Sequence, residues 1–278
     1  MKETIKMIGL ITLICFSFFY TDKVINVINE QDPIMIKINE VKDKYNIPSI
    51  NATTTKDTII PGINGQEVDV EKSYNNMREI GIFKSNLLIY KEVPPEITLS
   101  ENYDKYIISG NNKINNVSII MTITSSNINK LSELNNQNLN LFIDNDTLTQ
   151  NLSNIKKLQN TSIYPYGSNG TYEEDILTIS NNLLDKNVNN KPLYCLATIK
   201  NSQTLKKCQN KKMHTIIPSI NGENNAYNVI KNNIKNGSII YLKTDSKTLE
   251  ELNEIINYIT SKGYHIVSLE KLLSENIK

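Results

Sequence analysis

The clearest apolar run in the main body of the chain lies within Val117–Asn127, whose sequence is VSIIMTITSSN. Its centre is dense in β-branched residues and small polar residues end it, which is typical of a buried strand in a parallel sheet covered on both faces. In parallel α/β folds the functional side chains follow the carboxyl ends of the strands. Thr124 and Ser125 therefore occupy a position where catalytic side chains are expected, yet neither carries a carboxylate.

From Lys113 to the C-terminus, strand-like apolar runs alternate with segments whose apolar residues recur at helical spacing. This alternation predicts either a barrel of parallel strands ringed by helices or an open doubly wound sheet. The predicted strands are Val117–Thr124, Leu139–Asp144, Ser162–Tyr164, Pro192–Leu196, His214–Ile217, Ser238–Lys243 and Tyr264–Ser268. The predicted helices are Ile128–Asn135, Leu148–Leu158, Glu173–Leu184, Ala226–Lys235 and Leu249–Ser261.

The N-terminus has the pattern of an export signal, because Lys2 and Lys6 precede an apolar run from Met7 to Tyr20. At 1.5 Å per residue the run covers roughly 21 Å, less than a bilayer core of about 30 Å. Since Cys15–Ser17 is a poor cleavage site, we expect residues 1–22 to be an uncleaved signal anchor rather than a removed signal peptide. This predicts a single N-terminal anchor in the cell membrane and an extracellular main domain, with a buried core helix as the alternative.

The remaining chain is predicted to form three regions. Residues 23–57 are polar and mixed, which indicates a linker or stalk. Residues 58–112 combine the turn-rich Ile60–Gly65 with a helix predicted over Val70–Ile80, and we expect a small lead-in module there. Residues 113–278 form the main domain.

Charge and cysteines narrow the prediction. The formal net charge is only +1 and acidic and basic residues are interspersed, so we expect no nucleic-acid partner. If the protein is exported, Cys195 and Cys208 are predicted to form a disulfide. A loop of that size stabilises the fold by roughly 3 kcal/mol.

The order of these segments over 113–273 resembles the polysaccharide deacetylase family, that is, the NodB-homology domain of carbohydrate esterase family 4. Leu249–Leu273 is the most family-like stretch, and Lys191–Cys195 is similar to the family's Arg-Pro-Pro-Tyr-Gly motif. Gly237–Lys243 resembles the family's strand ending in Leu-x-His. The resemblance implies a deformed (β/α) barrel and metal-dependent removal of acetyl groups from N-acetylated polysaccharide.

The catalytic positions implied by this resemblance are substituted. Thr124 stands where the family has its base aspartate, and Ser125 where it has a metal-binding aspartate. Tyr166 and Gly170 fall near the two metal-binding histidines. Among the remaining positions, Lys191 replaces the arginine that orients the base and Lys243 the histidine that acts as general acid.

Without these groups the divalent metal of the family, such as zinc, has no adequate ligands, because hydroxyls are weak neutral donors. We therefore expect no metal and no catalytic residue. Two substitutes for the lost groups are possible. Asp144 and Asp146 end the second strand and are predicted to cap a turn, and a Ser-His-Asp site would need Ser125 or Ser126 with His214 or His265.

Tyrosines offer a way to bind glycan without catalysis, since a phenol ring stacks on a sugar and its hydroxyl forms hydrogen bonds. We predict Tyr166, Tyr194, Lys191 and Lys243 as substrate-binding residues. Packing inside the domain is the alternative for the tyrosines, which are Tyr166, Tyr172, Tyr194, Tyr227 and Tyr241.

The sequence thus predicts an exported pseudoenzyme of the polysaccharide deacetylase type that binds cell-wall or other N-acetylated glycan, or a partner in the cell envelope. One alternative is an active metal-dependent deacetylase with a non-standard site. The other is a structural or regulatory envelope module.

Overall fold

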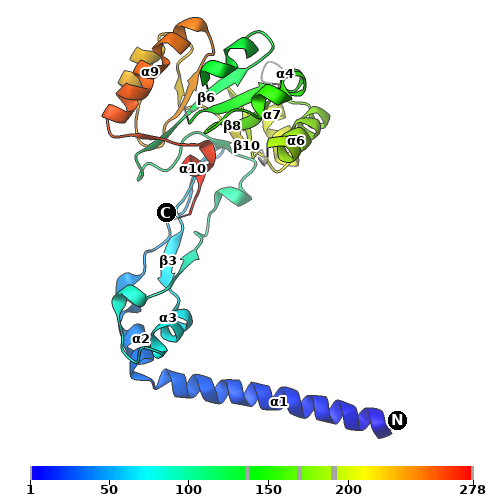
Figure 1. The fold of residues 1–278 in the computed structure, drawn as a ribbon, viewed down its shortest axis with the longest axis vertical. Coiled ribbons are helices and arrows are strands. Elements are labelled where there is room, and N and C mark those ends of the chain that lie inside the picture. Colours follow the sequence, from blue (N-terminus) through cyan, green and yellow to red (C-terminus); the bar gives the residue numbers. More distant parts are fainter. Residues whose placement is uncertain (1, 135–137, 168–170, 189–192, 277–278) are drawn as a thin grey trace. The chain divides into compact units, whose positions relative to one another are not determined.

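The computed structural model describes residues 2–134, 138–167, 171–188 and 193–276, and the chain divides into two compact units (Figure 1). The smaller unit holds Met1–Ser49 and Asn64–Val93, and the larger one holds Ile50–Ile63 and Pro94–Asn276. This division differs from the predicted ranges. The predicted lead-in module is shared between the units, and the predicted linker contains a well-formed helix, Pro33–Tyr45.

The N-terminal helix α1 (Lys2–Glu30) includes the apolar run of the sequence. At 1.5 Å per residue, the fourteen side chains of Met7–Tyr20 cover only roughly 21 Å. Within the described ranges, no helix is long and apolar enough to cross a membrane. This finding contradicts the predicted localisation, a single N-terminal anchor in the cell membrane with the main domain extracellular.

The smaller unit packs two helices against a two-stranded antiparallel sheet. Asp32 caps one helix by accepting the Ile34 N–H at 2.8 Å, and Asp69 caps the other by accepting the Lys72 N–H at 3.1 Å. Ile38 and Met77 are fully buried between them. The two helices are α2 (Pro33–Tyr45) and α3 (Val70–Arg78), and the sheet consists of β3 (Gly65–Val68) and β4 (Tyr90–Val93). The unit also contains the short helix η1 (Ser85–Leu87).

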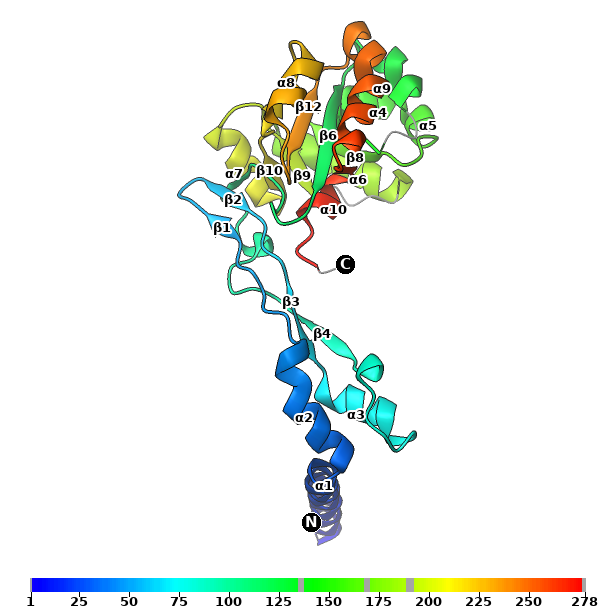
Figure 2. The same ribbon diagram turned by 90° about the vertical axis from the view of Figure 1, so that its left-hand side faces the viewer.

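Two mainly parallel sheets form the larger unit (Figure 2). The first has the order β11-β12-β6-β7-β8, with β13 beside β6, and the second has the order β1-β2-β5-β10-β9. Only the pair β1–β2 is antiparallel in the second sheet. The first sheet contains β6 (Asn116–Ile123), β7 (Asn140–Asp144), β8 (Ser162–Tyr166), β11 (Ile220–Asn221), β12 (Ile239–Leu242) and β13 (His265–Ile266). The second contains β1 (Thr53–Thr54), β2 (Thr58–Ile60), β5 (Tyr106–Ile107), β9 (Tyr194–Leu196) and β10 (His214–Ile216).

As predicted, β6 is buried on both faces. Ile119, Met121 and Ile123 point to one face and pack in the cluster that the helices complete, whereas Ile120 points the other way. We call the cluster on Ile120's side the inner core. It joins both sheets, and among its members are Ile120, Phe142, Tyr164, Tyr241, Tyr194, Leu196 and Ile216.

Helices cover the outer face of the first sheet (Figures 1 and 2). Most follow the predicted segments, but the predicted Leu148–Leu158 is two short helices, because the Asn151 side chain donates to the Thr147 carbonyl at 3.0 Å where the first one ends. The elements are η2 (Leu99–Glu101), η3 (Ile128–Leu134), α4 (Asn145–Gln150), α5 (Leu152–Ile155), α6 (Glu174–Val188), α7 (Ser202–Asn210), α8 (Ala226–Asn233), α9 (Ser246–Ser261) and α10 (Leu269–Leu273). Neither α7 nor β11 was predicted.

The last helix, α10, closes one end of the inner core with Leu269, Leu272 and Leu273. The buried Asn140 fixes it there. Its side-chain amide donates to the Ile119 carbonyl at 2.9 Å, and its side-chain oxygen accepts the Leu269 N–H at 2.8 Å. We call this region the α10 end. It lies at the starts of β6 and β7, so the carboxyl ends of these strands lie at the opposite end of the core.

Candidate functional site

A hollow of about 540 Å³ opens where β6, β7 and β8 end. It unites Thr124, Ser125 and Tyr166, three of the positions singled out from the sequence. We call it the strand-end hollow. Its lining consists of Thr124, Ser125, Asp144, Asn145, Asp146, Tyr166, Gly167 and Ile176.

The loop after β6 supplies the hydroxyls of the hollow. The Thr124 and Ser126 hydroxyls are hydrogen-bonded to each other at 2.8 Å, and the Asn127 side-chain oxygen accepts the Thr124 N–H at 2.8 Å. Both bonds join residues within the loop. Ser125 is exposed at its tip.

The end of β7 supplies two carboxylates. Both were predicted to cap a turn. Asp144 caps the helix α4, because its carboxylate accepts the Thr147 N–H at 2.9 Å and the Thr147 hydroxyl at 2.8 Å. Asp146 lies in the first turn of α4 and is exposed. Carboxylates are favoured here because the N-terminal turn of a helix carries a partial positive charge.

At the end of β8, Tyr166 is half-buried. Its ring packs edge-on against Tyr172, with 6.5 Å between the ring centroids. Burial raises the pKa of the Tyr166 phenol, and the nearby Tyr241 and Glu223 raise it further. Tyr166 therefore remains a neutral phenol at neutral pH and acts as a hydrogen-bonding group, not as a base.

Tyr241 lies on β12, and Glu223 lies in the segment after β11. The Tyr241 hydroxyl is hydrogen-bonded to the Thr122 hydroxyl at 3.0 Å. Burial is the main cause of the raised pKa of Tyr241, and Glu223 contributes to it. Glu223 was not among the predicted site residues, because a strand as short as β11 leaves no periodic signal in the sequence.

Lys243 and Tyr194, which were also predicted to bind substrate, are not among the residues that line the hollow. Lys243 is exposed and lies close to Asp245, whose pKa is lowered mainly by the Thr248 N–H and to a smaller extent by Lys243. Tyr194 is only 5% exposed and contacts Tyr164 edge-on, with the centroids 5.6 Å apart. Lys191 and Gly170 lie outside the described residues.

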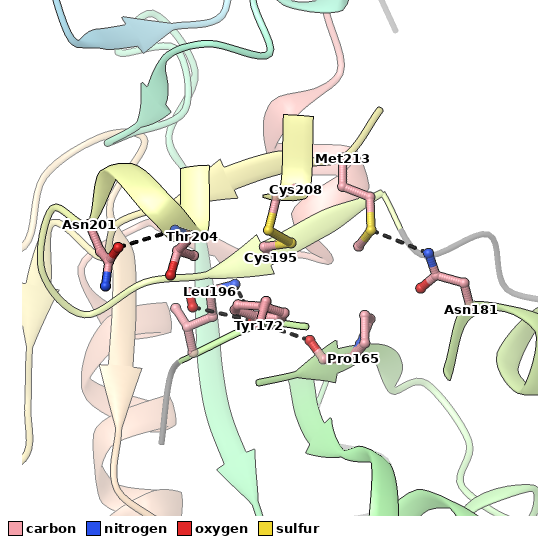
Figure 3. The surroundings of a disulfide bond; sticks show 9 residues. All are labelled: Pro165, Tyr172, Asn181, Cys195, Leu196, Asn201, Thr204, Cys208 and Met213. Carbon is pink, nitrogen blue, oxygen red and sulfur yellow. Dashed lines mark hydrogen bonds between the residues drawn. A yellow bond between two sulfur atoms is a disulfide. The ribbon is translucent and has the colours of Figure 1, made fainter. Parts of the chain in front are cut away.

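The predicted disulfide between Cys195 and Cys208 is confirmed, and it links β9 to α7 (Figure 3). Beside it, the buried Tyr172 bridges β8 and β9, which belong to different sheets. The Tyr172 hydroxyl accepts the Leu196 N–H at 2.8 Å and lies 3.3 Å from the carbonyl oxygens of Pro165 and Leu196, to which it can donate (Figure 3). These hydrogen bonds fix Tyr172, against which the Tyr166 ring packs.

The residues of the hollow do not fit the divalent metal that the resemblance implies. Ser125 and Tyr166 present neutral hydroxyls, and the Asp144 carboxylate caps α4. In the described part of the chain, no three His, Cys, Asp or Glu side chains are grouped to hold a metal ion. The donor set of Asp-His-His has no equivalent among these side chains.

The two histidines do not supply a serine nucleophile with a base. His214 begins β10 and His265 begins β13, whereas Ser125 and Ser126 follow the end of β6. His265 pairs with Asn116 at the start of β6, so the length of that strand separates it from the two serines.

No family model matches the chain. The uncharacterized protein YlxY of Bacillus subtilis is 22% identical over 280 residues, which cover 90% of this chain and 86% of YlxY. Wild-type BA3943 of Bacillus anthracis, described as a CE4 family pseudoenzyme, is similar in structure, with a TM-score of 0.65 and 22% identity over 89% of this chain and 97% of that one. The Bc1960 peptidoglycan N-acetylglucosamine deacetylase has a TM-score of 0.52 and 15% identity over 62% of this chain and 95% of its own.

These similarities establish the fold. The chain has the mixed α/β fold of the family 4 carbohydrate esterases, so the predicted resemblance to polysaccharide deacetylases is confirmed at the level of the fold. The ends of β6 and β8, which contribute to the hollow, hold Thr124, Ser125 and Tyr166, three of the positions that the predicted resemblance assigned to the family's motifs.

Proposed function

We propose that the larger unit is a deacetylase-like domain without deacetylase activity, which binds polysaccharide of the N-acetylated class in the strand-end hollow. Peptidoglycan and chitin-type chains are the candidate ligands. The observation that carries the proposal is the make-up of the hollow: it lies at the carboxyl ends of the strands, where parallel α/β folds carry their functional groups, but its lining offers hydroxyls, a phenol and two carboxylates without the histidines of the family's metal site.

Deacetylation needs a nucleophile strong enough to attack an amide carbonyl. Metal-bound water meets this need because its pKa falls from about 15.7 to about 7. The hydroxyls of the hollow lack a comparable activation, since the Thr124 and Ser126 hydroxyls are hydrogen-bonded to each other and the phenol of Tyr166 has a raised pKa. These features support binding without hydrolysis.

The same groups suit a sugar. Tyr166 and the 40% exposed Ile176 supply an aromatic and an aliphatic surface for the apolar face of a pyranose ring. Asp144, Asp146 and the hydroxyls of Thr124 and Ser125 can accept hydrogen bonds from sugar hydroxyls. The likeness to BA3943, described as a pseudoenzyme, supports the loss of activity, and the likeness to Bc1960 supports a glycan ligand.

The test uses the full chain and chitotetraose. Binding is measured by calorimetry, and release of acetate is measured with and without added Zn²⁺. We expect binding and no acetate above the protein-free blank. Tyr166→Phe should weaken binding about fivefold, as expected for one lost hydrogen bond. The matched control is Tyr227→Phe on α8, whose ring packs against Tyr258 outside the hollow.

Three outcomes would contradict the proposal. Zn²⁺-dependent release of acetate would identify an active deacetylase with a non-standard site. Equal effects of Tyr166→Phe and Tyr227→Phe would place the ligand elsewhere. Absence of binding to chitotetraose and to peptidoglycan fragments, together with a protein partner that co-purifies, would identify a structural or regulatory module.

A further inference from the structure

We infer that glycan binding in the strand-end hollow depends on the Cys195–Cys208 disulfide, which holds Tyr172 and through it Tyr166, so that reduction of this bond by a dithiol weakens binding. The inference rests on the proposed glycan binding and adds a form of regulation to the same site. Neither cysteine is among the described residues that line the hollow. The disulfide therefore acts through the residues that pack on it.

The disulfide belongs to a small buried cluster that joins β9, α6 and α7. We call it the disulfide cluster. Each of its members is at most 2% exposed, and they are Tyr172, Leu177, Cys195, Cys208 and Met213. Groups packed this closely move together, because a buried cluster leaves little free space around each side chain.

Tyr172 connects this cluster to the hollow. The Tyr172 hydroxyl accepts the N–H of Leu196, the residue next to Cys195, at 2.8 Å (Figure 3). Its ring lies edge-on to Tyr166, with the centroids 6.5 Å apart, and Tyr166 lines the hollow. A shift of β9 at Cys195 therefore moves the hydrogen bond that fixes Tyr172, and the Tyr166 ring loses its support.

The position of α7 depends on the disulfide. All nine residues of this helix are described, and of these Thr204 and Cys208 are the two that are buried. On the surface, Lys207 is paired with the exposed Glu173 at 3.1 Å. Because exposed ion pairs contribute little, breaking the covalent link to β9 allows α7 to move away from the cluster.

The reduction breaks one bond and balances without a further reactant. A thiolate of the dithiol attacks one sulfur of the disulfide, and the second thiol then releases that sulfur from the mixed disulfide. The dithiol is oxidised by two electrons to a cyclic disulfide, and its two protons end on the sulfurs of Cys195 and Cys208. Since both cysteines are 0% exposed, the reaction takes place when α7 opens locally.

The experiment uses the full chain with Cys15→Ser, because the exposed Cys15 thiol would otherwise exchange with the disulfide. Binding of chitotetraose is measured by calorimetry before and after reduction with dithiothreitol, and a thiol titration confirms that two thiols appear. We expect reduction to weaken binding about fivefold, as expected when one loosened side chain must be ordered on binding. Circular dichroism checks that the reduced chain is folded.

Two variants distinguish a local effect from general instability. Cys195→Ala/Cys208→Ala should reproduce the effect of reduction without any reagent. Ile255→Ala is the control, since it removes buried atoms from α9 on the outer face of the first sheet and destabilises the fold away from the disulfide. It should leave the affinity for chitotetraose unchanged at a temperature at which the variant is folded.

A double-mutant cycle tests the connection through Tyr172. Tyr172→Phe should weaken binding about threefold in the oxidised chain, as expected for one lost hydrogen bond. In the reduced chain the same substitution should weaken binding by less than about 1.5-fold, because reduction has already released the ring. Equal factors in the two chains would show that the disulfide does not act through Tyr172, and would overturn the inference.

The outcomes separate this inference from the proposed function. Equal affinity of the oxidised and the reduced chain overturns the inference and leaves glycan binding in place, whereas no binding by the oxidised chain overturns both. Loss of the circular dichroism signal of the folded chain on reduction also overturns the inference, because the disulfide would then hold the whole domain rather than the site. A loss of affinity in Ile255→Ala as large as that on reduction would do the same.

Discussion

The two ends of the inner core differ in how their polar groups are used. At the α10 end the polar side chains are buried and serve the fold: Asn140 is 0% exposed with both ends bonded to the main chain, and the Ser118 hydroxyl donates to the Val267 carbonyl at 2.6 Å. At the strand-end hollow the polar side chains are exposed or half-exposed. Ser125 and Asp146 serve no buried contact.

This contrast explains why the family resemblance survives without the family's catalytic groups. Buried polar groups at the α10 end must keep their partners, since an unpaired buried donor or acceptor costs about 1–3 kcal/mol. Residues that line an open hollow can change with little effect on the fold. Scaffold and site are thus separable in this chain, as they are in other folds that host several functions.

The largest effect is expected for Asn140→Ala at the α10 end. The variant leaves the Ile119 carbonyl and the Leu269 N–H without their partner in a buried position. We expect the free energy of unfolding to fall by about 4 kcal/mol, from two unsatisfied groups and a small cavity. Urea denaturation followed by circular dichroism measures it.

The control for this variant is Asn253→Ala on the exposed face of α9, which should change the free energy of unfolding by less than about 0.5 kcal/mol. A loss below about 1 kcal/mol in Asn140→Ala would show that the polar bridge at the α10 end contributes little. The fold would then not depend on the buried polar groups at the α10 end, and the contrast between the two ends would be contradicted.

The next effect depends on pH. His214 at the start of β10 stacks on Tyr103, with centroids 4.2 Å apart, and faces the ring of Tyr194 as well. Its Nδ1 atom is buried and has no hydrogen-bond partner among the residues that the structure describes, and burial lowers the pKa of His214 from 6.5 to about 4. The unfolded chain therefore binds a proton near pH 6.5 that the folded chain does not accept until about pH 4.

Stability contributed by the neutral His214 is complete above pH 6.5 and is lost as the pH falls towards 4. At about 1.36 kcal/mol per pKa unit, the loss is about 3 kcal/mol. His214→Phe keeps the stacking and removes the proton site, so the difference in unfolding free energy between wild type and variant should change over this range. A constant difference would contradict a buried neutral histidine.

Much of the fold could be predicted from the sequence, because the first sheet consists of apolar strands in an α/β alternation. The prediction of β6 matched to within one residue at each end, since its run of Ile and Met is buried on both faces. Several elements escaped prediction, among them α7, which is short and polar, and β11, which has two residues. The predicted membrane anchor was wrong because the described apolar stretch is too short.

The site was predictable in part. Thr124, Ser125 and Tyr166 meet in the hollow because parallel strands end at one edge, which the sequence pattern already implies. The approach of Glu223 and Tyr241 to Tyr166 could not be read from the sequence, because it depends on how β11 and β12 are placed beside β6. Tyr194, at the start of its strand, was predicted to bind substrate, but it lies in the inner core.

A smaller effect is expected for Tyr172→Phe, which tests how the hollow is held. The hydroxyl links Leu196 on β9 to Pro165 on β8, so its removal leaves the Leu196 N–H unpaired in a buried position. We expect a loss of about 2 kcal/mol in the free energy of unfolding. Because the Tyr166 ring packs on Tyr172, weaker glycan binding should accompany it. Tyr227→Phe is the control, and equal stability of the two variants would refute the bridge.

The smallest effect on stability is expected for Asp146→Asn. This variant tests most directly whether the polar groups of the two ends have different roles. Asp146 is exposed in the first turn of α4, so the variant loses only its interaction with the helix dipole, about 0.3–0.5 kcal/mol. The same variant should weaken binding of chitotetraose about threefold, because the Asp146 carboxylate can accept a hydrogen bond from a sugar hydroxyl. A residue that matters for the ligand and hardly for the fold is what an open binding hollow requires. If urea denaturation instead showed a loss of several kcal/mol, the carboxylate would serve the fold as Asn140 does, and the two ends would not differ in kind.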